Sequence, residues 1–249
     1  YPDENNDFET KFAERKAYLD GVQKELLADG IDVDVVIRSG FIADATQILV
    51  HEKHIDIVIT STRGKSGNLN WTSGGVSQKL IQKINQPVLL IQSSEDGIAA
   101  PPKLERILVP LDGSIFSERV LPYARVLAQV FDAELILLTV PAVPEPEDYH
   151  APSELIENIR HKAEVEIENF LEAVARSLSE SGIRVRTMVA GTLPARTIVN
   201  VGHDEDVDLI MSTSRGRGGL ALFMLGSEAQ RIVEKSDKNV FMIPIRDRP

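Results

Sequence analysis

The chain repeats itself at a fixed spacing, and this duplication constrains the fold more than any other feature. Without a gap, positions in the first part recur 152 residues later, and the shared positions are mainly glycines and apolar residues. Examples are Gly30 with Gly182, Val33 with Val185, Asp56 with Asp208, Gly64 with Gly216, Gly74 with Gly226 and Ile91 with Ile243. Recurring glycines and apolar runs at one offset indicate a structural unit used twice, so we predict two tandem domains of one fold.

Within each copy, short runs rich in Val, Ile and Leu alternate with amphipathic stretches, which is typical of a parallel sheet covered by helices. In the second copy we predict strands at Ile107–Pro110, Leu135–Val140, Val185–Val189, Leu209–Ser212 and Val240–Ile245. We predict helices at Ser117–Val130, Ser153–Ser181, Pro194–Gly202 and Ser227–Lys235. The predicted fold class is therefore α/β: two tandem five-stranded parallel-sheet, three-layer α/β/α domains of the HUP/Rossmann-like kind.

The first copy matches the second only from its long helix onward. The opening strand of the second copy, near Arg106, has no counterpart, so we expect roughly 45 residues of strand, helix and strand before Tyr1, either removed or not included in this chain. The predicted organisation is an incomplete domain over residues 1–96, a linker over 97–103 and a complete domain over 104–249. Because unpaired edges favour pairing, we expect the final strands, Val88–Gln92 and Val240–Ile245, to meet within the chain.

Bulk composition narrows the partners. Hydrophobic residues make up 43% and charged residues 26%, the balance of a globular protein with a real core. The net charge is −11 and the isoelectric point is near 5.0, which argues against a broad surface for nucleic acid or anionic membrane. The chain has no cysteine, and its apolar runs are too short to span a bilayer. We predict a cytoplasmic protein without nucleic-acid or membrane partners.

A glycine-rich segment follows the predicted strand Leu209–Ser212 and leads to Gly226 and Ser227, which open a helix. Parallel α/β sheets bind ligands at the carboxyl ends of their strands, where glycines and a helix N-terminus can receive a phosphate. Arg215 and Arg217 could add positive charge, and the Ser227 hydroxyl could donate to a phosphate oxygen. The alternative is a glycine-rich turn in which the serine only caps the helix.

A second segment places an acid at the carboxyl end of the strand Ile107–Pro110, where Leu111 and Asp112 follow. In a doubly wound sheet, this end can lie beside the strand that contains Ser212. Asp112 could then accept hydrogen bonds from an amine or hydroxyl of a ligand. The alternative is that Asp112 only caps the following helix.

These residues resemble the universal stress protein family, and the resemblance covers nearly the whole chain. The family's phosphate signature is a glycine, two residues, a glycine, nine residues, and then Gly-Ser or Gly-Thr. Here Gly216, nine intervening residues and Gly226-Ser227 match it. Thr213 occupies the first glycine position, and Ala229 stands where ATP-binding members often have a hydroxyl residue.

The resemblance implies an ATP site in the second copy, with Asp112 and Val140 near the base and the glycines around the ribose and phosphates. The predicted nucleotide-binding residues are Pro110, Asp112, Val140, Ser212, Thr213, Gly216, Arg217, Gly226, Ser227 and Glu228. ADP and AMP, and a Mg²⁺ ion with the phosphates, stay open as alternatives. In the first copy Ser61 and Gly75 replace signature residues, so we predict that it binds no nucleotide.

No catalytic or metal-binding pattern stands out, because the sequence has neither a Walker lysine motif nor a nucleophile-elbow motif. The main hypothesis is a stress-response sensor or regulator that binds ATP through its second copy. A nucleotide-free interaction module of the same fold and a slow ATPase are the alternatives. Besides the contact between the two copies within the chain, a homodimer stays open as a further association.

Overall fold

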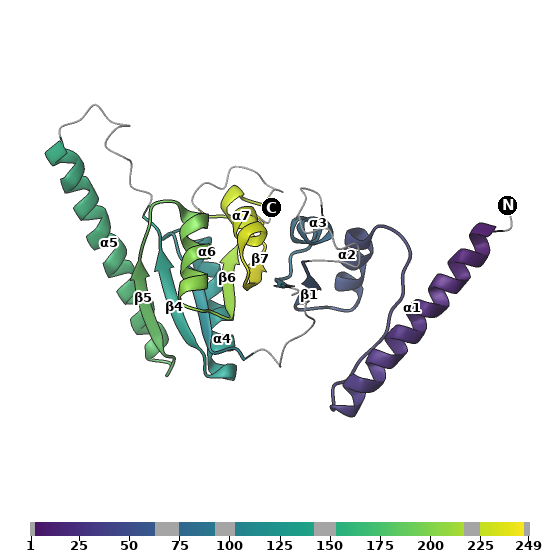
Figure 1. Cartoon of the computed structure of the whole chain (residues 1–249). Helices are drawn as coiled ribbons and strands as arrows, with labels where there is room; N and C mark the ends of the chain where they lie inside the picture. The colour runs from purple at the N-terminus through teal and green to yellow at the C-terminus, as the bar shows by residue number, and fades with distance from the viewer. Residues whose placement is uncertain (1–2, 63–74, 93–102, 142–152, 217–224, 247–249) are drawn as a thin grey trace. The chain divides into compact units, whose positions relative to one another are not determined.

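The computed structural model describes residues 3–62, 75–92, 103–141, 153–216 and 225–246 (Figure 1). These residues belong to two compact units, Tyr1–Ala45 and Thr46–Pro249. The predicted linker before Lys103 and the predicted site residue Arg217 lie outside the described residues. Within the described ranges, no helix combines the length and the apolar character needed to cross a membrane.

The first unit consists of helix α1 (Asp3–Ala28), an extended segment and the start of helix α2 (Ile42–Glu52). Gly30 ends α1 in the left-handed region, with φ of 80°, and the Gln23 side chain donates a hydrogen bond to the carbonyl of Val33 at 2.8 Å. Residues 31–39 form no strand, although the repeat aligns them with a strand of the second copy.

This difference has a physical reason. The aligned strand of the second copy, β5 (Val185–Val189), lies at the edge of its sheet and pairs with β4 (Glu134–Thr139). At the repeat spacing, the counterpart of β4 would precede Tyr1, and no strand among the described residues pairs with residues 31–39. An extended segment without a partner does not form a stable strand in water.

The second unit contains one sheet of seven strands. The first copy contributes β1 (Val58–Ser61) and β2 (Val88–Ile91). The second copy contributes β3 (Arg106–Pro110), β4, β5, β6 (Leu209–Thr213) and β7 (Asn239–Ile243), which pair in parallel throughout. This confirms the five-stranded parallel sheet predicted for the second copy, with strand ends within two residues of the predicted ones.

The helices of the second copy also match the prediction closely. They are α4 (Leu121–Phe131), α5 (Ser153–Ser179), α6 (Pro194–Asp204) and α7 (Ser227–Lys235). The stretch predicted as one helix from Ser117 begins as a 3-10 turn, η1 (Ser117–Val120). Pro122 lies in the first turn of α4, where its missing N–H removes no hydrogen bond of the helix.

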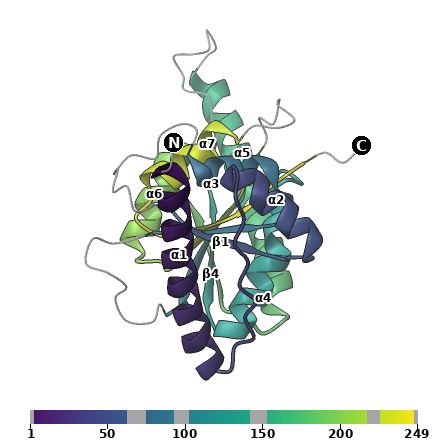
Figure 2. The same cartoon turned by 90° about the vertical axis from the view of Figure 1, so that its right-hand side faces the viewer.

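Alternation along each strand divides the core into two layers. Leu135 and Leu137 of β4 pack in one cluster with residues of α4 and α5, whereas Ile136 and Leu138 pack in another with residues of α6 and α7. Because successive side chains of a strand point to opposite faces, both faces of the sheet are covered. Figure 2 shows α4 and α6 on opposite sides of the strands, as a three-layer architecture requires.

The two copies join through their last strands, as predicted. Strand β2 pairs antiparallel with β7, with Leu90 opposite Val240, and the Gln92 amide donates to the side chain of Asn239 at 2.9 Å. Helix α3 (Val76–Lys83) of the first copy also contacts the second copy, because Arg246 donates to the carbonyl of Gln82. The core cluster on the α6–α7 side therefore includes residues of both copies.

The strand order is β1-β2-β7-β6-β3-β4-β5. From β3 the chain moves outward in one direction to β4 and β5, and then returns to the other side of β3 to form β6 and β7. The carboxyl ends of β3 and β6 thus flank the point where the direction reverses. Open α/β sheets bind ligands in the crevice at such a point.

Candidate ligand-binding site

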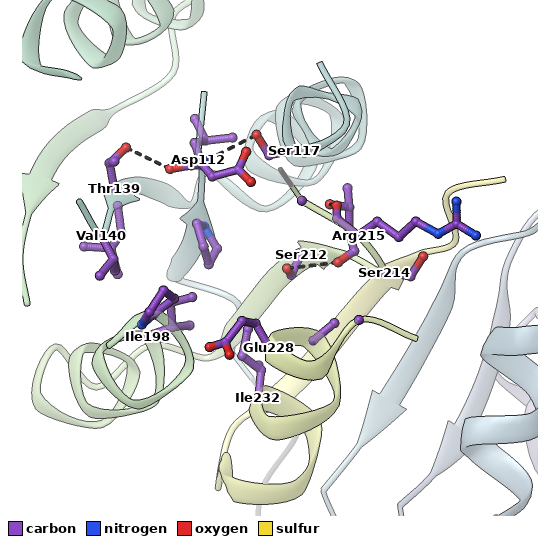
Figure 3. A pocket seen from close by; sticks show the side chains of 18 of the residues that line it. Asp112, Ser117, Thr139, Val140, Ile198, Ser212, Ser214, Arg215, Glu228 and Ile232 are labelled. Carbon is purple, nitrogen blue, oxygen red and sulfur yellow. Dashed lines mark hydrogen bonds between the residues drawn. The ribbon is translucent and has the colours of Figure 1, made fainter. Parts of the chain in front are cut away.

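A cavity of about 520 Å³ opens at this reversal point (Figure 3). Its walls come from the ends of β3, β4 and β6 and the residues that follow them, from α6 and α7, and from one residue each of η1 and α5. Pockets for small molecules usually measure a few hundred to about 1,000 Å³, so the cavity is large enough for a ligand of nucleotide size.

All the site residues predicted from the sequence, except Arg217, line this one cavity. They are Pro110, Asp112, Val140, Ser212, Thr213, Gly216, Gly226, Ser227 and Glu228. Arg217 lies outside the described residues. The fold therefore brings together segments that are far apart in the sequence.

Asp112 is fixed by the backbone around it. The amide of Leu111 donates to the carbonyl of Leu138, and the Thr139 hydroxyl donates to the carbonyl of Leu111, both at 2.8 Å. These bonds extend the pairing of β3 and β4 by one residue. The carboxylate of Asp112 then accepts a hydrogen bond from the amide of Ser114 at 2.9 Å, which holds the side chain at the carboxyl end of β3.

The hydrogen bonds around Asp112 differ from those of a helix cap. The amide of Ser117, the first residue of η1, donates to the Ser114 hydroxyl at 3.2 Å. Ser114, and not Asp112, is therefore the side chain that accepts the first amide of η1, and the Asp112 carboxylate forms a tight turn with Ser114 instead. The backbone amide of Asp112 donates to the Ser117 hydroxyl at 3.3 Å, which ties the turn to the helix start (Figure 3).

The loop after β6 is anchored by Ser214, which the sequence reasoning did not single out as a structural residue. Its amide donates to the carbonyl of Ile243 at 2.9 Å, and its hydroxyl accepts the amide of Ile245 at 2.8 Å. Its carbonyl accepts the amide of Gly226 at 2.9 Å. Ser214 thus connects the end of β6, the end of β7 and the start of α7.

Gly216 allows the closest approach in the site. A Cβ atom at this position would lie 2.3 Å from Oδ2 of Asp112 and 3.3 Å from its Cγ. Only a glycine leaves room for the carboxylate in this position. The match of Gly216 to the predicted phosphate signature therefore has a structural cause: Gly216, just after β6, lies directly against Asp112, the acid after β3.

Helix α7 starts without a side-chain cap. Its N-cap is Gly226, which has no side chain to offer a hydrogen bond, and Ser227 is exposed. The structure thus does not support the alternative that Ser227 only caps the helix. The first amides of a helix and its positive dipole end favour an anion, so this end of the cavity can accept phosphate or carboxylate oxygens.

Arg215 does not direct its charge toward the carboxylates of the cavity, although the sequence suggested that it could add charge to a phosphate site. The residue is 6% exposed, and Figure 3 shows its guanidinium pointing away from Asp112 and Glu228. Burial lowers the pKa of Arg246, and the positive charge of Arg215 lowers it further. The positive charge of Arg215 therefore acts on Arg246.

Sequence reasoning missed the apolar wall of the cavity. This wall includes Ile198 on α6, Ile232 on α7, and Leu225, all of which belong to the core cluster on that face of the sheet. Their spacing indicates only a buried helix face. Nothing in such a pattern distinguishes a core position from one that lines a cavity.

An open α/β sheet with a ligand-sized cavity at its reversal point, an acid after the first strand and an uncapped helix start defines the doubly wound class of ligand-binding proteins. The profile of the Universal stress protein family matches residues 2–92 and 103–244. The chain belongs to this family, as the sequence resemblance predicted.

Individual relatives agree with the family match. The universal stress protein YxiE of Bacillus subtilis is 32% identical over 144 residues, which cover 55% of this chain and 97% of that protein. The universal stress protein MJ0577 of Methanocaldococcus jannaschii is 28% identical over 154 residues, which cover 56% of this chain and 94% of that protein.

Solved structures show the same fold. A universal stress protein from Archaeoglobus fulgidus superimposes with a TM-score of 0.70 at 19% identity, covering 99% of this chain and 81% of that one. The structure of MJ0577 superimposes with a TM-score of 0.54 at 27% identity, covering 59% of this chain and 99% of that one.

Proposed function

We propose that the second copy binds an adenine nucleotide in this cavity and that the chain acts through it as a cytoplasmic sensor or regulator of a stress response. One observation carries the proposal: the Asp112 carboxylate and the uncapped start of α7 line the same cavity. A nucleotide site needs two groups: a hydrogen-bond acceptor for an amine or hydroxyl of the nucleoside, and hydrogen-bond donors for the phosphate oxygens.

Each part of a nucleotide would meet a chemically suitable group in the cavity wall. Asp112, held by the amide of Ser114, would accept hydrogen bonds from an amine or hydroxyl of the adenosine part. The apolar side chains of Val140, which is half-buried, and Ile198 offer a surface for the base. The amide of Ser227, in the first turn of α7, would donate to a phosphate oxygen. ATP is the ligand that the family resemblance implies, with ADP, AMP and a phosphate-bound Mg²⁺ as variants of the same chemistry.

A regulatory role fits a site that binds without transforming its ligand. The bound nucleotide would stabilise the conformation in which the loop after β6 lies against Asp112, and it would shift the population toward that state by its differential affinity. The same linkage predicts a higher melting temperature in the presence of ligand.

Calorimetric titration of ATP into the whole chain tests the proposal, with Asp112→Ala and Gly216→Val as site variants. Asp204→Ala, at the exposed far end of α6, is the matched control. We expect saturable binding of about one equivalent per chain that both site variants abolish and the control retains. Binding that survives both site variants would place the nucleotide elsewhere, and no binding at millimolar ATP would favour the nucleotide-free interaction module.

A further inference from the structure

Among the described residues of the cavity wall, Glu228 is the acidic side chain that connects the starts of two helices. It lies in the first turn of α7, and its Oε2 accepts the backbone amide of Ala195 in the first turn of α6 at 2.8 Å. Its Oε1 accepts the side chain of Arg231 at 2.7 Å. The carboxylate therefore occupies a position that favours an anion from two sides.

The charges of the described cavity wall are mainly negative. Asp112 and Glu228 are its two carboxylates, and Arg215 points its guanidinium away from both (Figure 3). The partner of Glu228, Arg231, is 63% exposed on its side chain, so solvent screens much of its charge. The wall therefore has a fixed negative charge near the helix start that would receive phosphate.

We propose that Glu228 acts as an internal anion that competes with the phosphates of the ligand, and that it sets the preference of the site for adenosine and AMP over ATP. This inference rests on the proposed nucleotide site and specifies its ligand. Glu228 was predicted from the sequence simply as a nucleotide-binding residue. The geometry instead assigns it a role in specificity: its carboxylate, held by the Ala195 amide, provides negative charge in the first turn of α7, where the phosphates would bind.

The physical basis is the repulsion between like charges. A carboxylate within a few ångströms of a phosphate repels it, and each further phosphate adds negative charge near the same wall. An uncharged nucleoside feels no such repulsion, whereas its base and ribose still contact Asp112 and the apolar wall. The affinity of the site should therefore not increase from adenosine to AMP to ATP.

Titrations of adenosine, AMP and ATP, each with and without Mg²⁺, test this inference in the unaltered chain and in Glu228→Gln. Glutamine keeps an oxygen that can accept the Ala195 amide, so the two helices stay connected while the charge is removed. Glu234→Gln on the same helix is the matched control, because Glu234 bonds to Gln230 and does not line the cavity. A thermal melt of each variant confirms that it is folded.

We expect the unaltered chain to bind adenosine at least as tightly as ATP. Glu228→Gln should raise the affinity for ATP on the order of tenfold and leave that for adenosine within about twofold, whereas Glu234→Gln should change neither. Equal ATP affinity in the unaltered chain and in Glu228→Gln would overturn this inference and leave the nucleotide site intact. So would a loss of ATP affinity seen only with Mg²⁺, which would make Glu228 a cation ligand. If no ligand binds to either protein, the proposed nucleotide site is wrong and the inference falls with it.

Discussion

Replacing Gly216 by alanine should displace the Asp112 carboxylate and weaken both the fold and the site. A Cβ atom at position 216 would come to 2.3 Å from Oδ2 of Asp112, well below the 3.4 Å at which ordinary contact begins. The backbone of Gly216 is outside the left-handed region, so the alanine itself is tolerated there. The strain must therefore be relieved by movement of Asp112.

The magnitude follows from the bonds that this movement breaks. Turning the carboxylate away removes its hydrogen bond from the Ser114 amide, and a hydrogen bond to a charged acceptor contributes about 1.5–3 kcal/mol. Because Asp112 is half-buried, we expect the lower end, about 1.5 kcal/mol, which corresponds to a fall in melting temperature of roughly 3–6 °C for a chain of this size. Loss of the acceptor should also weaken nucleotide binding on the order of tenfold.

A double-mutant cycle isolates this contact. Denaturant unfolding and calorimetry would be measured for Gly216→Ala, Asp112→Ala and the double variant. Once the carboxylate is absent the added methyl group meets no obstacle, so the double variant should be no less stable than Asp112→Ala. Gly21→Ala in α1, where a Cβ meets nothing within 4 Å, controls for a simple glycine replacement. Strictly additive losses in the double variant would refute the contact between Gly216 and Asp112.

Three further predictions concern the ion pairs, the core and the stoichiometry. The Arg186 hydrogen bond lowers the pKa of Glu205, so Glu205→Gln should cost about 0.5–1 kcal/mol at pH 7. This cost should disappear as the pH falls through the lowered pKa of Glu205, because the carboxylate then takes up a proton and loses its charge. Urea unfolding at several pH values measures the cost, and a cost that does not change with pH would contradict the prediction. Leu90→Ala, in the core shared by both copies, should lower the free energy of unfolding by about 2–5 kcal/mol. Ile59→Ala, on the exposed edge strand, should lower it by less than about 1 kcal/mol. Similar losses for the two variants would argue against the shared core. Calorimetry should give one nucleotide per chain and the same affinity in Gly75→Val, whereas two equivalents would show that the first copy also binds.

Much of this fold was predictable because local and long-range signals agree in the second copy. The alternation of β4, with Leu135 and Leu137 on one face and Ile136 and Leu138 on the other, requires helices on both sides of the sheet. The tendency of exposed strand edges to pair, together with the family resemblance, then predicted that the last strands meet. The absent strand at residues 31–39 was not predictable in this way, because strand formation depends on a neighbour and the repeat reports only the local pattern.

The site was predictable where backbone constraints leave a mark in the sequence. Gly216 is needed to make room for Asp112, and Gly226 begins a helix close to the Ser214 carbonyl, so both positions show as glycines. Side-chain direction leaves no such mark. The outward guanidinium of Arg215 and the bond from the Ala195 amide to Glu228 depend on the packing of helices that are distant in sequence.

The first copy also supports the candidate site through a continuous series of contacts. Strand β2 pairs with β7, so the last strand of the second copy is an inner strand of the sheet. The residues at the end of β7, Ile243 and Ile245, bond to Ser214, which in turn accepts the amide of Gly226 at the start of α7. The pairing of β2 with β7 therefore supports Ser214 and the start of α7, next to Gly216, which lies against Asp112. If the first copy binds no nucleotide, as predicted, it would still influence the affinity proposed for the second copy, because a change that separates β2 from β7 would loosen the contacts of Ser214.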